Sequence, residues 1–274
     1  MSSPHSPSPK TAPIGVFDSG IGGLSVMQAL RALLPHEDYL YCADTAHAPY
    51  GEKSEEYIRE RCFALADFLI AQGAKALVVA CNTATAVALK DLRLRYTLPV
   101  IALEPALKPA VAASRSGVVG VLATRRTVES AHFQGQVARH GGTARILPQP
   151  CPKLVTLLEA GAQDTPEMTT ALHDYLTPLL AQGADVLVLG CTHFVFLRAG
   201  IQALVGSNIT LFDSGAGVAR VLRDRLQSMN ALNPSSEIGA VRFWSSAASD
   251  KTKAVMDRLW GQDITLEAML PSHA

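Results

Sequence analysis

The sequence predicts an α/β fold of two similar domains, each a mostly parallel sheet flanked by helices, related by pseudo-twofold symmetry. Short apolar runs alternate with amphipathic helical patterns along almost the whole chain, which is typical of parallel sheets covered by helices. Two segments, Ala71–Thr83 and Ala181–His193, are identical at seven of thirteen positions. The 274 residues, 48% of them hydrophobic, are enough for two cores.

Short apolar runs mark the strands, and apolar residues three or four apart mark the helices between them. The expected strands are Ile14–Asp18, Tyr39–Ala43, Ala76–Cys81, Val100–Leu103, Val118–Ala123, Ala144–Leu147 and Val186–Gly190. The expected helices have apolar faces from Leu24 to Leu34 and from Ile58 to Leu69, run from about Thr83 to Arg95, and begin at Pro105, Arg125 and Pro166, the last preceded by the segment Lys153–Ala160. Thr165 followed by proline is a typical helix start.

Composition and charge exclude several classes of protein. The formal net charge is zero and the pI is about 7.1, so we expect no nucleic-acid or membrane partner. The apolar runs are far shorter than the roughly 20 residues that span a bilayer. The 5 cysteines are widely spaced and odd in number, which favours reduced thiols in a cytoplasmic protein. Residues 1–12 are rich in Ser and Pro, and we expect a disordered tail there.

Each repeated segment ends its apolar run on a cysteine, Cys81 or Cys191. Both thiols are expected at the carboxyl end of a strand, where the next helix begins and where parallel sheets bind ligands. The positive end of a helix dipole lowers a thiol pKa, so we expect reactive thiols. A single cysteine in such a place is more often a core residue, but here the thiol is kept while its neighbours differ between the two copies.

The segment Asp18–Gly23 is a glycine-rich turn from a strand to a helix, and its backbone N–H groups suit an anion. It has neither the GxGxxG spacing nor the lysine of nucleotide-binding loops, so a small carboxylate is the favoured ligand. The alternative is a tight turn in which Asp18 is an N-cap. A similar segment, Leu211–Val218, follows another strand, and there we interpret Asp213 as an N-cap.

Several chemistries remain open from the residues alone. The polar loop Ala43–Gly51 is a candidate wall of a site. A metal site is a poor explanation of Cys191 and His193, because no CxxC or HExxH motif exists. Hydrolysis by a Cys–His pair would leave Cys81 unused. Two equivalent thiols fit the inversion of a stereocentre, which needs one acid/base on each face of a planar carbanion.

The stretches IGVFDSGIGGLSV, APYGEKSEEY, ALVVACNTATA, EPALKPA, CPKLV, VLGCTHF and LFDSGAGVAR resemble those of the glutamate racemases, amino-acid racemases that use no cofactor. The related aspartate racemases share the two cysteines and are the alternative, but the PYG and CNTAT blocks favour glutamate. One departure is Val195-Phe196 after CTHF, where we expect a proline-containing segment.

The resemblance implies a set of site residues. Cys81 and Cys191 would be the catalytic acid/bases, with Asp18 and His193 as their respective helpers. Thr124 would contact the substrate carboxylate, and Asp44 and Glu159 would have supporting roles. The other substrate-lining residues would be Ser19, Tyr50, Gly51, Asn82, Thr83 and Thr192.

The resemblance also implies the organisation and setting of the protein. Residues 13–104 with 212–274 would form the first domain and residues 105–211 the second, with glutamate bound between them. The enzyme would be a cytoplasmic homodimer that needs neither metal nor cofactor and supplies D-glutamate for peptidoglycan precursors.

Overall fold

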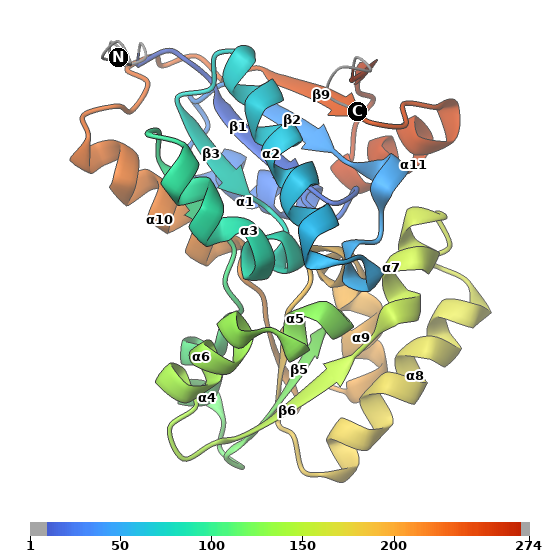
Figure 1. Cartoon of the computed structure of the whole chain (residues 1–274). Coiled ribbons are helices and arrows are strands. Elements are labelled where there is room, and N and C mark those ends of the chain that lie inside the picture. Colours follow the sequence, from blue (N-terminus) through green and yellow to red (C-terminus); the bar gives the residue numbers. More distant parts are fainter. Residues whose placement is uncertain (1–9, 270–274) are drawn as a thin grey trace.

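The computed structural model describes residues 10–269, which form two β-sheets flanked by helices (Figure 1). The larger sheet has the strand order β10-β9-β2-β1-β3-β4, and the smaller has the order β6-β5-β7-β8. Every strand pairing in the described residues is parallel. The predicted α/β class with two sheet-and-helix halves is therefore confirmed.

The larger sheet is formed mainly by the N-terminal part of the chain, and the C-terminal residues return to it. β9 pairs with β2, and α10 packs along α1. Its strands are β1 (Ile14–Asp18), β2 (Tyr39–Ala43), β3 (Ala76–Val79), β4 (Val100–Ala102), β9 (Val241–Ser245) and β10 (Leu266–Ala268). Its helices are α1 (Leu24–Leu33), α2 (Glu55–Ala71), α3 (Asn82–Arg95), α10 (Gly215–Ser228) and α11 (Asp250–Trp260), with the short 3-10 helices η1 (Thr45–His47) and η2 (Tyr50–Glu52).

The smaller sheet is formed by the middle of the chain. Its strands are β5 (Val118–Ala123), β6 (Arg145–Pro150), β7 (Val186–Leu189) and β8 (Thr210–Phe212). The surrounding helices are α4 (Leu107–Ala113), α5 (Arg125–Glu129), α6 (Ala131–His140), α7 (Pro152–Glu159), α8 (Pro166–Ala181), η3 (Thr192–Leu197) and α9 (Arg198–Val205). The domain boundaries after residues 104 and 211 stay a prediction. Residue 104 lies between β4 and β5, which belong to different sheets, whereas residue 211 lies inside β8, one residue before that strand of the smaller sheet ends.

The two sheets share one strand order, because β2-β1-β3-β4 corresponds to β6-β5-β7-β8. The repeated segments lie at corresponding places. Gly73 and Gly183 end the preceding helices with φ of 90° and 87°, a left-handed conformation that glycine adopts without steric cost. Cys81 and Cys191 then follow the equivalent strands β3 and β7. The internal repeat is therefore a repeat of structure as well as of sequence.

The helix expected directly after Cys191 is of a different type. Residues 192–197 form the 3-10 helix η3, and α9 begins only at Arg198. Phe194 and Leu197 are both buried, as a helix with three residues per turn allows for side chains three positions apart. Val195, one of the two residues that depart from the family pattern, lines a second pocket beside Cys191.

Other boundaries differ from the predicted ones for local reasons. The strand expected over Ala144–Leu147 extends to Pro150; it pairs only with β5 and is half exposed, so its apolar signal is weak. The helix expected from Arg125 is divided at Ser130, whose hydroxyl accepts a hydrogen bond from the Phe133 N–H and starts α6. The expected N-cap at Asp213 is off by one residue. Ser214 holds that position, and the Asp213 carboxylate accepts from the Gly215 N–H instead.

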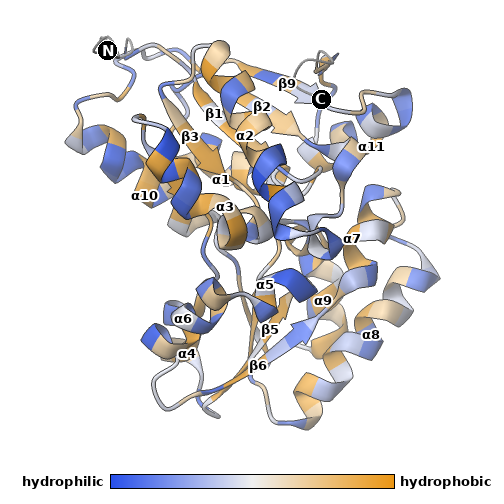
Figure 2. Ribbon diagram, viewed as in Figure 1, coloured by the Kyte–Doolittle hydropathy of each residue, from blue (hydrophilic) through white to orange (hydrophobic). Residues whose placement is uncertain are grey.

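Apolar residues fill the strands and the inner helix faces, while the outer faces are polar (Figure 2). One cluster of buried residues continues from the larger sheet into the smaller, and includes Met27 and Leu30 of α1 and Phe194 and Leu197 of η3. Within residues 10–269, no helix combines the length and the apolar character that a bilayer span requires. Most of the predicted tail, residues 1–9, lies outside the described residues.

Candidate active site

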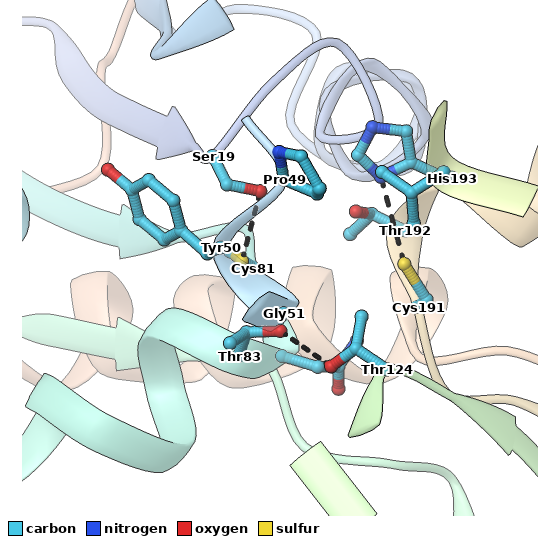
Figure 3. Close-up of a pocket in the computed structure, with 12 residues that line it drawn as sticks. Ser19, Pro49, Tyr50, Gly51, Cys81, Thr83, Thr124, Cys191, Thr192 and His193 are labelled. Carbon is cyan, nitrogen blue, oxygen red and sulfur yellow. Dashed lines mark hydrogen bonds between the residues drawn. The ribbon is translucent and has the colours of Figure 1, made fainter. Parts of the chain in front are cut away.

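A pocket lies between the two sheets, at the carboxyl ends of their strands (Figure 3). This is where parallel sheets bind ligands. Most of the residues named from the sequence meet there, and Asp18, Asp44 and Glu159 lie just behind its wall. The lining residues are Ser19, Pro49, Tyr50, Gly51, Cys81, Asn82, Thr83, Thr124, Val155, Cys191, Thr192 and His193.

Cys81 is the N-cap of α3, and its sulfur accepts a hydrogen bond from the Ala84 N–H at 3.4 Å. Its thiol also donates to the Ser19 hydroxyl at 3.5 Å, and that hydroxyl donates to Asp18 at 3.3 Å. Burial, and then the Asp18 carboxylate, raise the pKa of Cys81 well above its usual value despite the N–H donor. The expected lowering of this thiol pKa is therefore wrong, because a helix start does not offset removal from water.

Cys191 lies across the pocket from Cys81 (Figure 3), and its sulfur is 3.7 Å from the His193 Nδ1. The His193 Nε2 is 2.6 Å from a Glu159 carboxylate oxygen. Burial alone would lower the pKa of His193, but its hydrogen bonds with Cys191 and Glu159 outweigh burial and raise it well above the usual value. His193 is therefore suited to hold a proton beside the Cys191 sulfur.

Asp18 organises the glycine-rich turn. Its carboxylate accepts from the N–H groups of Ser19 at 2.7 Å and Gly23 at 2.5 Å, and from the Thr192 hydroxyl at 3.2 Å. The carboxylate is fully buried, and burial raises its pKa although His193 opposes that shift. Asp18 therefore joins the two halves of the molecule as well as closing the turn, since Thr192 begins η3, which follows β7 of the smaller sheet.

The anion expected on the glycine-rich turn is present as a side chain of the protein. A Glu159 carboxylate oxygen accepts from the Ile21 N–H at 2.8 Å. Glycine permits the close approach here: a Cβ on Gly20 would force the Glu159 carboxylate to move, and one on Gly22 would overlap the His193 ring. Glu159 thereby links the turn of the larger sheet to His193.

Hydroxyl groups form the floor of the pocket. Thr83 lies 2.9 Å from Thr124 between their hydroxyl oxygens, and both contact the Thr127 hydroxyl, at 3.3 and 2.9 Å respectively. Gly51 packs directly over the Thr124 side chain. These groups come from α3, α5 and η2 and present neutral donors to a ligand. Among the described lining residues none is arginine or lysine.

Tyr50 lines the pocket with its backbone and ring, but its hydroxyl points away from the thiols (Figure 3) and donates to Asp44 at 2.5 Å. Arg61 of α2 holds the same carboxylate through two hydrogen bonds of 2.8 and 2.9 Å. Asp44 and Arg61 are both buried, so the pair fixes the loop that carries Tyr50 and Gly51. His47 of that loop bonds to the Tyr57 hydroxyl, outside the pocket.

Sequence reasoning did not identify Val155, Thr127 or Arg61, and it included Pro49 only as part of the candidate wall Ala43–Gly51. Pro49 and Val155 are apolar lining residues, and neither carries a polar group that would mark it as a site residue. Thr127 could have been found from the sequence, because a threonine three residues before it fits the usual N-cap pattern. In the structure the Thr127 N–H does bond to the Thr124 hydroxyl. Arg61 lies on a helix among other charged residues, and only the fold brings it to Asp44.

Comparison with known proteins assigns the chain to a class. A family model described as Asp/Glu/Hydantoin racemase matches residues 14–222. The chain therefore belongs to the aspartate/glutamate racemase family.

Individual relatives in that family are glutamate racemases. Those of Ectopseudomonas mendocina and Pseudomonas aeruginosa PAO1 are 52% and 50% identical to this chain over 252 and 253 residues, 92% of this chain and 95% of each relative. A crystal structure of a glutamate racemase from Bacillus anthracis superposes with a TM-score of 0.88 at 31% identity, covering 96% of this chain and 98% of that one. The Francisella tularensis enzyme, crystallised with D-glutamate, gives 0.83 at 29% identity over 95% and 98%.

Proposed function

We propose that this protein interconverts L- and D-glutamate, with Cys81 and Cys191 as paired acid/bases. The observation that carries the proposal is the position of the two thiols. They follow equivalent strands of two sheets with the same order and lie on opposite sides of one pocket. Inversion of a stereocentre by two acid/bases, one on each face of the carbanion, requires this placement.

In the proposed reaction one thiolate removes the α-proton of the bound zwitterion, and the opposite thiol delivers a proton to the other face. Asp18 acts beside Cys81 through the Ser19 hydroxyl, and His193 acts beside Cys191. The carbanion places negative charge on the α-carboxylate. Backbone N–H groups at the starts of α3 and η3 are suited to stabilise that charge, and the Thr83 and Thr124 hydroxyls are suited to bind a substrate carboxylate.

Chiral chromatography of L-glutamate incubated with the purified full chain tests the activity. D-glutamate should form without any added cofactor, and dialysis against hydroxylamine, which removes pyridoxal phosphate, should leave the rate unchanged. L-aspartate serves as the comparison substrate and should react much more slowly. An aspartate rate equal to the glutamate rate would overturn the assignment of substrate.

Single variants test the two thiols. Cys81→Ala and Cys191→Ala should each abolish conversion in both directions, because either direction requires both thiols. Cys62→Ala is the matched control, since Cys62 is a buried cysteine of α2 outside the pocket, and it should retain activity. A Cys–His hydrolase would instead keep substantial turnover in Cys81→Ala.

Racemisation in deuterium oxide distinguishes a two-base mechanism from a one-base mechanism. A thiol that delivers its proton has exchanged with solvent, whereas the abstracting thiol holds the hydrogen of the substrate. The first D-glutamate formed from protiated L-glutamate should therefore carry deuterium at Cα while the remaining L-glutamate stays protiated. Substantial protium in the early D-product, measured by mass spectrometry of the separated enantiomers, would contradict the paired thiols.

We further propose that the enzyme is a cytoplasmic homodimer whose D-glutamate enters peptidoglycan precursors. Depletion of the protein in its host should arrest growth, and external D-glutamate should restore growth. Light scattering of the purified chain should give twice the monomer mass of 29.1 kDa.

A further inference from the structure

The hydroxyl of Tyr41, a buried tyrosine of β2, lies behind the pocket rather than in its wall. Its side chain has no exposed surface, and its ring packs edge-on against Phe243, with centroids 6.2 Å apart. Its hydroxyl donates a hydrogen bond of 2.9 Å to the Gly20 carbonyl. Burial raises the pKa of Tyr41 well above its usual value, so the hydroxyl remains a donor throughout the working pH range.

The Gly20 carbonyl belongs to the same peptide group as the Ile21 N–H. A peptide group is planar, so a bond that fixes its carbonyl also fixes the direction of its N–H. The Ile21 N–H donates to Glu159, and Glu159 contacts the His193 Nε2. The other ring nitrogen of His193 faces the Cys191 sulfur. An unbroken series of hydrogen bonds therefore runs from β2 in the larger sheet to the thiol of the smaller one.

We propose that Tyr41 is a positioning residue for Cys191, acting through the Gly20–Ile21 peptide, Glu159 and His193. The inference rests on the proposed two-thiol function. We expect the effect of Tyr41 on the Cys191 side, because Cys81 is served by Ser19 and Asp18 through separate hydrogen bonds. The alternative is that Tyr41 acts on Cys81 through Gly23, which lies close to both Tyr41 and Asp18.

Tyr41→Phe removes only the hydroxyl, and Tyr39→Phe is its matched control. Tyr39 lies two residues earlier on the same strand, is equally buried, and donates to the Leu30 and Leu34 carbonyls far from the pocket. Circular dichroism should show both variants folded. Loss of one hydrogen bond that orients a catalytic group should reduce kcat/KM by about fivefold to tenfold in Tyr41→Phe, with little change in Tyr39→Phe.

The kcat/KM values of the two directions must fall together, because enantiomers are equal in free energy. Isotope effects identify the side that is impaired. A weakened Cys191 makes its own proton transfer more rate-limiting. The α-deuterium isotope effect on kcat/KM should then rise for the enantiomer that Cys191 deprotonates and fall for the other. A role in folding alone would leave this pattern unchanged.

Two reference variants show how the isotope effects of the two enantiomers change when one side of the pocket is weakened. The comparison holds whichever enantiomer each thiol deprotonates. Glu159→Gln weakens the Cys191 side, and Ser19→Ala, which removes the hydroxyl bonded to Cys81, weakens the Cys81 side, so their isotope effects should shift in opposite directions. The isotope effects of Tyr41→Phe should shift in the same direction as those of Glu159→Gln. A shift in the direction of Ser19→Ala, or isotope effects like those of Tyr39→Phe, would overturn the inference and leave the two-thiol function standing. Failure of the unaltered protein to form D-glutamate would overturn both.

Discussion

At the residue scale, the environment of a thiol decides its chemistry more than its position on a helix does. Cys81 has the N–H donor expected of a helix start, yet burial and the Asp18 carboxylate raise its pKa. The site therefore holds this thiol protonated until substrate or a neighbouring group changes the balance. Asp18 and His193 lie beside the two sulfurs. Because the pKa values of Asp18 and His193 are both raised, these side chains are suited to exchange protons with the thiols.

The rate at which a cysteine is alkylated depends on both the exposure and the ionisation of its thiol. Iodoacetamide should modify Cys81 and Cys191 before Cys42, Cys62 and Cys151, because the first two are 5% and 7% exposed and the others are fully buried. Glutamate should protect the first pair. Peptide mass spectrometry after short exposures measures the order, and earlier labelling of Cys42, Cys62 or Cys151 would contradict it.

The pH dependence of that labelling follows from the raised pKa of Cys81. Only the thiolate reacts, and a raised pKa means that the thiolate fraction keeps increasing with pH above about 8.5, where an ordinary thiol is half ionised. The rate of Cys81 labelling should therefore not reach its midpoint by about pH 9.5, where an ordinary thiol is already about nine-tenths ionised. A midpoint at or below about pH 8.5 would show that the pKa is not raised.

At the element scale, the turn between β1 and α1 is the contact that holds the two halves at the site. Its glycines allow the Glu159 carboxylate and the His193 ring to approach the backbone directly. Those side chains come from α7 and η3, which belong to the smaller sheet. The position of the turn therefore affects the orientation of the His193 ring, because Glu159 bonds to both.

Gly20→Ala should disrupt this contact, because the added methyl group overlaps the Glu159 carboxylate. We expect kcat/KM to fall by about 10²-fold or more, on the scale of a displaced acid/base group. The control is Gly217→Ala on α10, where nothing lies within 4 Å of the added carbon; it should be neutral or stabilise the helix by about 1 kcal/mol. Steady-state kinetics with thermal unfolding separates the two effects, and an active Gly20→Ala enzyme would refute the coupling.

At the scale of the whole molecule, a buried ion pair ties two segments distant in the sequence to the larger sheet. Lys75 lies 2.6 Å from Glu37, with side chains 3% and 2% exposed. The Lys75 ammonium also bonds to the carbonyls of Lys10 and Ala231, and Glu37 accepts from the Asn233 N–H. The segment before β1 and the connection after α10 therefore meet at one charged centre.

Lys75→Met should lower the free energy of unfolding by about 3–5 kcal/mol, because it leaves the Glu37 carboxylate buried without its partner. The Lys75→Met, Glu37→Met double variant should lose less, since no uncompensated charge remains. Lys253→Met is the surface control; its ion pairs are partly to fully exposed, and such pairs contribute at most about 1 kcal/mol each. Denaturant unfolding measures all three, and a Lys75→Met loss no larger than the surface control would contradict this role.

The sequence by itself determined the α/β alternation, the repeated unit and the place of both thiols. These features are local: the spacing of apolar residues sets each element, and a residue that follows a buried parallel strand necessarily lies at the ligand-binding edge. Most of the pocket lining could be predicted for the same reason, since Ser19, Tyr50, Thr83, Thr124 and Thr192 all lie beyond strand ends.

Only the tertiary structure decided the contacts that set the chemistry of the pocket. Ile21 and Glu159 are 138 positions apart in the sequence, and no periodicity links them. Arg61 reaches Asp44 from the side of a helix, and Tyr41 reaches the glycine-rich turn from a neighbouring strand. The direction of the Cys81 pKa shift was predicted wrongly for the same physical reason: desolvation depends on everything packed around a group, and that packing is assembled from the whole chain.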